Sequence, residues 1–345
     1  MKLFSNDLGV DLGTSNVRIY ADNHGVVVNE PSVVAMDKNT GKVLKVGSEA
    51  RNMLGRTPGN IVAMHPLKDG VVSDHGMTVR LLQELLREAA PRGLFTPKPR
   101  IVLAVPSGAT EVEERTLMNA AIEAGAQRVY MVESPLAAAL GANLDIYGPN
   151  GHMVVEIGGG TTNVAVLSLN GVARSSSCEV AGDSFDEAIV RFVRRKGVVI
   201  GKSTAEEIKI KIGCVDEQAE EVSMTFRGRD IKSGMPCDMT ISSKDIFDVL
   251  RRLARTIADE VASLLEDTSP ELVSDIVENG ITLTGGGAQL WGMTQVIEKR
   301  TGIRCTVADD PASCVAFGCG KILPFLSHMK EGPINIAKKR IMRQD

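Results

Sequence analysis

Aromatic residues are scarce in this chain. They make up 3% of its 345 residues, and the net charge is −4. So few rings leave little on which nucleic-acid bases could stack, and a slightly acidic chain lacks the basic face that nucleic-acid binding usually needs. We therefore expect no nucleic-acid partner. Long apolar runs are also missing: none approaches the ~18 residues that a membrane span needs.

Metal-binding and nucleophile motifs are missing as well. The five histidines form no His-Glu-x-x-His pair, and there is no Cys-x-x-Cys pair and no Gly-x-Ser-x-Gly elbow. We interpret the six scattered cysteines as reduced, mostly buried thiols. The first seven residues are too few and too polar for a signal peptide. We therefore expect a cytoplasmic protein.

The sequence does contain a repeated pattern. Residues 10–17 read VDLGTSNV, and residues 155–164 read VEIGGGTTNV. Each segment predicts a strand, a tight glycine turn and a returning strand. Backbone N–H groups at such a turn form a concavity for anions, and an acid at its mouth can hold a hydrated Mg²⁺ against phosphates. Two such hairpins predict two related domains that face each other across one nucleotide, and 345 residues suffice for two domains.

Strands and helices alternate along the rest of the chain, which predicts an α/β protein with mixed sheets. Apolar, β-branched runs predict strands at 26–28, 33–36, 101–105, 129–132, 153–157 and 281–284. Helical periodicity predicts helices at 77–90, 111–124, 185–195, 204–212, 244–266 and 314–325. Thr110, Ser243 and Asp310-Pro311 are the expected helix starts.

Three further segments carry polar chemistry. Gly285, Gly286 and Gly287 follow a predicted strand, an arrangement that is a plain turn when alone but a candidate base and ribose site beside two phosphate hairpins. Glu206 and Lys209 lie one helical turn apart and either face a nucleoside together or form an exposed ion pair. Residues 197–203, GVVIGKS, are one residue short of a P-loop. We interpret them as a helix connection in which Ser203 or Thr204 caps the next helix.

Taken together, these segments resemble the actin, chaperone and sugar-kinase ATPase superfamily, and within it the MreB family of bacterial actin homologues. The most specific matches are 29–35 (NEPSVVA), 54–61 (LGRTPGNI), 66–71 (PLKDGV), 133–142 (ESPLAAALGA), 227–230 (RGRD) and 310–320 (DPASCVAFGCG). The resemblance covers residues 6–322, which is nearly the whole chain.

The resemblance implies the actin-like ATPase fold: duplicated ribonuclease H-like domains, two lobes, four subdomains and a nucleotide in the cleft. The first lobe is expected at 1–145 plus 310–345, with a small subdomain inserted at about 32–65. The second lobe is expected at 146–309, with a small subdomain at about 183–240.

The resemblance also assigns site residues. ATP and Mg²⁺ are the implied cofactors, and Asp11 and Glu156 are the acids near the metal, acting through water. The implied phosphate contacts are Gly13, Thr14, Ser15, Asn16, Gly158, Gly159, Gly160 and Thr161. The implied nucleoside contacts are Glu206, Glu207, Lys209, Gly285, Gly286, Gly287 and Ala288. The implied catalytic positions are Thr161 and Ser134, with Glu133 as a weaker candidate.

Three positions depart from the family pattern. Glu156 stands where the family usually has Asp, and Asn163 stands where it usually carries an acid. Ser134 occupies the position of the family's hydrolytic Glu, and a hydroxyl cannot act as a carboxylate base. Glu133 is adjacent, but neighbouring residues point in different directions. Loss of such a group typically costs ~10²–10⁴ in rate, so we expect a weak ATPase with slow hydrolysis.

The implied function is that of a filament protein. The resemblance implies homopolymers, in paired antiparallel protofilaments, on the inner face of the cytoplasmic membrane, where they organise cell-wall elongation proteins and thereby cell shape. Leu94 and Phe95 lie among basic residues in RGLFTPKPR and resemble the family's membrane-inserting loop; the alternative is that the pair packs inward. A sugar or carboxylate kinase of the same superfamily is the alternative function, but no clear substrate base is present for it.

Overall fold

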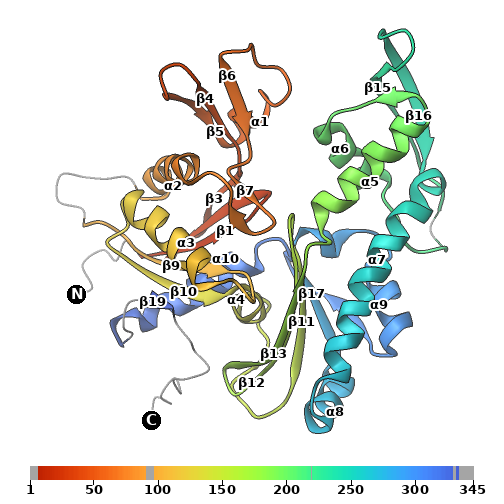
Figure 1. Ribbon diagram of the computed structural model, residues 1–345. Coiled ribbons are helices and arrows are strands. Elements are labelled where there is room, and N and C mark those ends of the chain that lie inside the picture. Colours follow the sequence, from red (N-terminus) through yellow and green to blue (C-terminus); the bar gives the residue numbers. More distant parts are fainter. Residues whose placement is uncertain (1–6, 91–96, 219, 329–331, 334–345) are drawn as a thin grey trace.

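The chain consists of two halves, each built on a mixed β-sheet (Figure 1). The computed structural model describes residues 7–90, 97–218, 220–328 and 332–333. The first sheet has the order β19 (Gly332–Pro333), β10 (Arg128–Glu133), β9 (Arg100–Val105), β1 (Leu8–Leu12), β2 (Asn16–Ala21) and β3 (Gly25–Pro31). The second has the order β18 (Cys305–Val307), β17 (Ile281–Thr284), β11 (His152–Ile157), β12 (Thr162–Ser168) and β13 (Gly171–Cys178).

The two sheets repeat one topology. β1 pairs antiparallel with β2 and parallel with β9, while β11 pairs antiparallel with β12 and parallel with β17. The next pairs outward also correspond, because β2–β3 and β12–β13 are antiparallel whereas β9–β10 and β17–β18 are parallel. Five strands of each sheet therefore match in order and direction. This is the arrangement expected of an internal duplication. It gives the two glycine hairpins, β1–β2 and β11–β12, equivalent positions in their sheets.

Each sheet has its own helices and apolar core. In the first half, α2 (His75–Ala89) and α3 (Glu111–Glu123) pack their buried leucines and alanines on β1, β2 and β9. In the second half, five helices share the core with β11, β12 and β17. They are α5 (Gly182–Arg195), α6 (Lys202–Ile212), α7 (Ser243–Glu266), α8 (Pro270–Asn279) and α9 (Met293–Thr301).

Two short helices lie between the sheets. Helix α4 (Ser134–Gly141) packs against α10 (Cys314–Ile322), and their core also includes side chains from β9 and β10 on one side and β11 and β12 on the other. Figure 1 shows α10, in blue, returning from the C-terminal part of the chain to lie beside α4. The 3₁₀ helix η2 (Leu323–His328) continues from α10. This helix pair joins the two halves.

A small unit extends outward from each half. In the first, β4 (Val34–Asp37), β5 (Val43–Val46) and β6 (Ile61–Met64) form a sheet next to α1 (Gly47–Arg51), and β7 (Leu67–Lys68) and β8 (Val71–Val72) form a ribbon below it. In the second, β14 (Val198–Val199), β15 (Ser223–Asp230) and β16 (Pro236–Ser242) form a sheet beside α5 and α6. Figure 1 shows these two units at the same end of the molecule.

Most predicted elements are present, with shifted ends. Thr110 caps α3 and forms a capping box with Glu113, but α7 is capped by Ser242 rather than Ser243, and Ser313 precedes α10. Residues 197–203 connect α5 to α6 as predicted, but the expected cap at Ser203 or Thr204 was wrong, and the connection contains a short strand. Strand β14 lies inside this segment because Val198 and Val199 pair with β15, and the residue that precedes α6 is Gly201. Among the described residues, no helix has the length and apolarity needed to cross a bilayer.

Candidate functional site

A cavity of about 1030 Å³ lies between the two glycine hairpins. Its lining combines residues from four parts of the chain that the sequence analysis singled out, together with the start of α5. From the predicted set these are Asp11, Gly13, Thr14, Ser15, Asn16, Glu156, Gly158, Gly159, Glu206, Lys209, Gly285, Gly286 and Gly287. The structure thus brings together residues as far apart in sequence as Asp11 and Gly287, as the duplicated hairpins predicted.

The first hairpin turn is fixed by hydrogen bonds to neighbouring backbone. The Gly13 N–H donates to the Asn16 carbonyl at 3.1 Å, which closes the turn. Ser32 holds the turn from the side, because its hydroxyl donates to the Gly13 carbonyl at 2.6 Å and its N–H donates to the Ser15 carbonyl at 2.9 Å. The Thr14 hydroxyl accepts from the Gly70 N–H at 3.0 Å and can still donate its own proton.

The second turn repeats this closure and packs against the first. The Gly158 N–H donates to the Thr161 carbonyl at 2.9 Å. A Cβ at Gly159 would lie 2.1 Å from the Ser15 hydroxyl oxygen, and a Cβ at Gly160 would lie 2.8 Å from the Asp69 Cα. Only glycine fits at these contacts between the two halves. Gly160 and Thr161 therefore lie at this junction rather than in the cavity lining.

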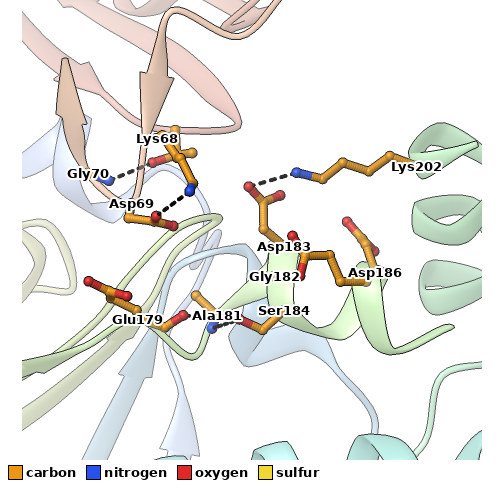
Figure 2. Close-up of polar contacts among 12 residues, drawn as sticks. Lys68, Asp69, Gly70, Glu179, Ala181, Gly182, Asp183, Ser184, Asp186 and Lys202 are labelled. Atoms are coloured by element: carbon orange, nitrogen blue, oxygen red, sulfur yellow. Dashed lines mark hydrogen bonds and ion pairs between the residues drawn. The ribbon is translucent and has the colours of Figure 1, made fainter. Parts of the chain in front are cut away.

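Helix α5 begins at the second turn. The Gly182 N–H donates to the Gly158 carbonyl at 3.0 Å, and the Asp183 N–H donates to the Gly159 carbonyl at 2.7 Å. The positive end of the helix dipole is therefore directed at the cavity. Figure 2 shows this helix start, where Asp183 also faces Lys202 of α6 at 2.9 Å, opposite the β7–β8 turn with Asp69 and Gly70.

Glu206 and Lys209 both line the cavity, but they are not paired with each other. The Lys209 Nζ contacts the Asp186 carboxylate at 2.9 Å and the Gly182 carbonyl at 3.1 Å. Burial raises the pKa of Asp186 to about 6, and Lys209 limits the rise. Glu206 forms an ion pair with Arg51 of α1, in the opposite half. Glu207 is exposed, is bonded to Lys211 and does not line the cavity, so the position of Glu207 gives no support to a nucleoside contact.

The third glycine cluster borders the cavity from the second half. Gly285 has φ +80°, a conformation that favours glycine, and its N–H donates to the Pro311 carbonyl at 2.7 Å. A Cβ at Gly286 would have no atom within 4 Å, so this residue faces open space at the start of the 3₁₀ helix η1 (Gly286–Gln289). Ala288 is buried below it. The backbone here leaves room for a flat group.

Two acids line the cavity: Glu156 is buried and Asp11 is half-buried. Burial raises the pKa of Asp11 to about 6, against the lowering effect of Arg18. Burial raises the pKa of Glu156 to about 7, and the nearby charge of Asp11 adds to the rise. Such carboxylates are stabilised by a cation. No group of three or more His, Cys, Asp or Glu in the described part of the chain could hold a metal ion alone. The residues therefore fit a Mg²⁺ that keeps water and phosphate ligands.

The three departures from the family pattern contact one another. The Ser134 hydroxyl donates to Glu156 Oε2 at 2.6 Å, and the Asn163 amide donates to the same oxygen at 3.0 Å. The Ser177 hydroxyl in turn donates to Asn163 Oδ1 at 3.0 Å. The extra methylene of Glu156 thus carries its carboxylate to Ser134. Glu133 lies outside this cluster, because its carboxylate accepts from the Ser107 hydroxyl at 3.2 Å.

Some residues of the site were missed and others lie outside the described residues. Arg18 and Gly182 line the cavity but were not predicted. Arg18 could have been found from hairpin register, since it lies directly opposite Asp11. The contact of Arg51 with Glu206 has no sequence signal. Leu94 and Phe95, the predicted membrane contacts, lie outside the described residues.

Comparisons with known proteins agree with this architecture. The family model described as MreB/Mbl protein matches residues 5–331. The chain is 45% identical to the cell shape-determining protein Mbl of Bacillus subtilis, over 93% of this chain and 96% of that protein. It is 46% identical to the cell shape-determining protein MreB of Escherichia coli K12, over 94% and 95%.

Solved structures resemble the fold over the same extent. MreB5 of Spiroplasma citri bound to AMPPNP has a TM-score of 0.87 and 38% identity, with 94% of this chain and 98% of that chain covered. The MamK double helical filament, at 23% identity and a TM-score of 0.78, shows the fold alone. The actin-like fold class expected from the sequence is confirmed.

Proposed function

Because the chain belongs to the MreB/Mbl protein family, we propose that it is an ATP-binding, actin-like protein that polymerises with copies of itself and helps to determine cell shape. The observation that carries the proposal is the pair of glycine hairpins facing one cavity in a chain that matches this family over nearly its whole length. MreB5 of Spiroplasma citri was solved with AMPPNP and with ADP, which supports an adenine nucleotide as the ligand.

The chain offers distinct contacts to the parts of such a nucleotide. The concave glycine turns and the positive end of the α5 dipole suit the phosphates. The open backbone at Gly286, with Glu206 and Lys209 opposite, suits the nucleoside. A bound Mg²⁺ would neutralise phosphate charge, with Asp11 and Glu156 holding its water ligands. The two-lobe division at 145/146 and 309/310 belongs to this proposal, and the packing of α10 against α4 and β1 supports it.

Hydrolysis is proposed to be slow. Ser134 cannot take a proton from water as a carboxylate does, and its hydroxyl is engaged with Glu156. Thr161 lies beside Gly70 at the junction of the two halves, where it can orient a water but supplies no base. The protein is thus proposed to be a weak ATPase whose binding and assembly do not depend on fast turnover. The cell-shape names of its relatives favour this function over a sugar or carboxylate kinase.

Electron microscopy of the purified full chain with ATP and Mg²⁺ tests the proposal. We expect straight, paired filaments with ATP, and few or none when nucleotide is removed. The control is the variant Gly159→Val, because a side chain there would collide with Ser15 and separate the two turns. A wild-type protein that binds ATP yet shows no polymer at any concentration would favour the kinase alternative.

Filaments of this family member are proposed to lie on the inner face of the cytoplasmic membrane and to organise cell-wall elongation proteins. The membrane contact is assigned to Leu94 and Phe95, on sequence alone. Burial of each would contribute ~1.5–3 kcal/mol, and a filament multiplies that through avidity. We expect Leu94→Ser/Phe95→Ser to abolish co-sedimentation with anionic liposomes while filaments still form. Val112→Ser/Ile122→Ser, at two exposed apolar positions of α3, is the matched control; equal loss in both variants would disprove the assignment.

A further inference from the structure

Arg18 projects from the first hairpin into the cavity. It lies directly opposite Asp11 in the β1–β2 pairing, so the two side chains share one face of the sheet. Val17 and Ile19, its neighbours on β2, point to the other face and are fully buried in the core with α2. Arg18 therefore cannot turn into the core, and it lines the same cavity as the two glycine turns.

The guanidinium of Arg18 is poorly satisfied within the protein. Its Nη1 lies 3.9 Å from Asp11 Oδ2, which is close enough for ionic attraction but too long for a hydrogen bond. Its Nε is buried and has no hydrogen-bond partner among the described residues. A guanidinium carries five N–H donors, and leaving such donors unbonded away from water costs free energy. The geometry suits a ligand with several acceptor oxygens.

The other cations of the cavity are already engaged. Lys209 contacts Asp186 at 2.9 Å and the Gly182 carbonyl at 3.1 Å, and Lys211 is bonded to Glu207 at 2.7 Å. Among the described cations that line the cavity, Arg18 is thus the one that forms no hydrogen bond. It also lies opposite Asp11, whose negative charge would otherwise repel a phosphate chain.

We propose that Arg18 binds the phosphate chain of the nucleotide directly and supplies part of the positive charge that Mg²⁺ otherwise provides. The planar fork of a guanidinium matches two phosphate oxygens at once. Asp11 then has two roles, since its charge orients the guanidinium and it would also hold water ligands of a bound Mg²⁺. This inference rests on the proposed nucleotide binding and predicts that the protein retains nucleotide after Mg²⁺ is removed.

The test is the affinity of the full chain for ADP, measured by calorimetry with excess Mg²⁺ and with EDTA. Arg18→Leu is expected to weaken ADP binding about ten- to a hundredfold in EDTA, with a smaller loss in Mg²⁺. Arg18→Lys should recover part of the affinity in EDTA. Adenosine, which has no phosphate, should bind the wild type and Arg18→Leu equally. Circular dichroism checks folding, and Arg18→Gln is the second neutral variant should Arg18→Leu not fold.

A double-mutant cycle separates direct contact from simple neutralisation of Asp11. If Arg18 contacts phosphate, its replacement by Leu also weakens ADP binding in the Asp11→Asn background. A loss that disappears in that background, or neutral variants that bind ADP in EDTA as tightly as the wild type, would overturn the inference. Failure of the wild type to bind ADP or ATP with Mg²⁺ would instead overturn the proposed function itself.

Discussion

Glu156 accepts hydrogen bonds from Ser134 and Asn163 on a single carboxylate oxygen, and this contact links all three departures from the family pattern. Where the family is expected to carry three acids, this chain has one acid and two neutral donors. Asn163 is in turn held by Ser177. The three residues are therefore mutually compatible. An acid restored at position 134 or 163 alone would place a second carboxylate against Glu156. Hydrolysis in this cleft is therefore best tested by changing Ser134 and Glu156 together.

Restoring a carboxylate at position 134 should speed hydrolysis. We expect Ser134→Glu/Glu156→Asp to raise the rate of phosphate release at least tenfold, because a positioned base or water-orienting group typically contributes ~10²–10⁴. Ser134→Glu alone should gain less, since like charges that share a site oppose ionisation. The control Ser134→Ala removes the hydroxyl without adding a base and should not accelerate the reaction. A wild type as fast as a relative with Glu at this position would contradict the prediction.

A site residue could be predicted from the sequence when the residues that define its role are close to it in the chain. The glycines of both hairpins were predicted because a tight turn needs glycine, and the whole pattern lies within a few consecutive residues. Glu207 was assigned with Glu206 from the same helix, yet only Glu206 and Lys209 line the cavity, since residues three apart share a face and adjacent ones do not. The ion pair between Arg51 and Glu206 joins residues 155 positions apart, so no local pattern indicates it.

Elements were predicted where their apolar pattern was strong. Strand β11 is buried almost throughout and was found, whereas β15 and β16 alternate exposed polar side chains and were not. The pairing of β14 with β15 produces a strand of only two residues within a glycine-rich segment. Sheet pairing of that kind is stabilised by partners distant in sequence, so tertiary contacts determine it rather than local propensity.

Helices α4 and α10 pack closely against each other, and this contact depends on glycine. A Cβ at Gly318 would lie 1.7 Å from the Ala137 carbonyl oxygen, and one at Gly141 would lie 1.8 Å from the Cys314 carbonyl oxygen. Both clashes are with backbone, which cannot rotate away as a side chain can. The two helices therefore approach as closely as their main chains allow, and this contact connects the two sheets.

Gly318→Ala should destabilise the protein. The added methyl group has to separate α10 from α4, and overpacking of this kind typically costs about 1–3 kcal/mol. We expect a clearly lower midpoint of urea unfolding, measured by circular dichroism. Gly76→Ala, in α2, is the control: its nearest contact is 3.7 Å away, so it should be neutral or stabilising by up to about 1 kcal/mol. Equal unfolding midpoints for both variants would contradict the prediction, because they would show that α10 and α4 can move apart without loss of stability.

At the scale of the whole molecule, the two halves meet at both ends of the cavity. They are joined at the floor by the contact of Ser15 with Gly159 and by the α4–α10 pair. At the mouth they are joined by the ion pair of Arg51, in the outer unit of the first half, with Glu206 of α6. Figure 1 shows α1 and α6 on opposite sides at the same end of the molecule. Since both side chains are partly exposed, this contact is the easier of the two to break.

Arg51→Ala should therefore release nucleotide faster without loss of stability. An exposed ion pair is worth about 0.2–1 kcal/mol, so we expect the dissociation rate of a fluorescent ADP analogue, followed by stopped-flow displacement, to rise about 1.5- to 5-fold. Lys45→Ala is the matched control, because Lys45 pairs with Glu49 within the same outer unit and its loss leaves the mouth contact intact. If the ion pair of Arg51 does not affect nucleotide release, the ADP analogue will dissociate from the two variants at the same rate. Slower release from Arg51→Ala would instead mean that Arg51 competes with the nucleotide for Glu206, and that opening of the mouth does not limit exchange.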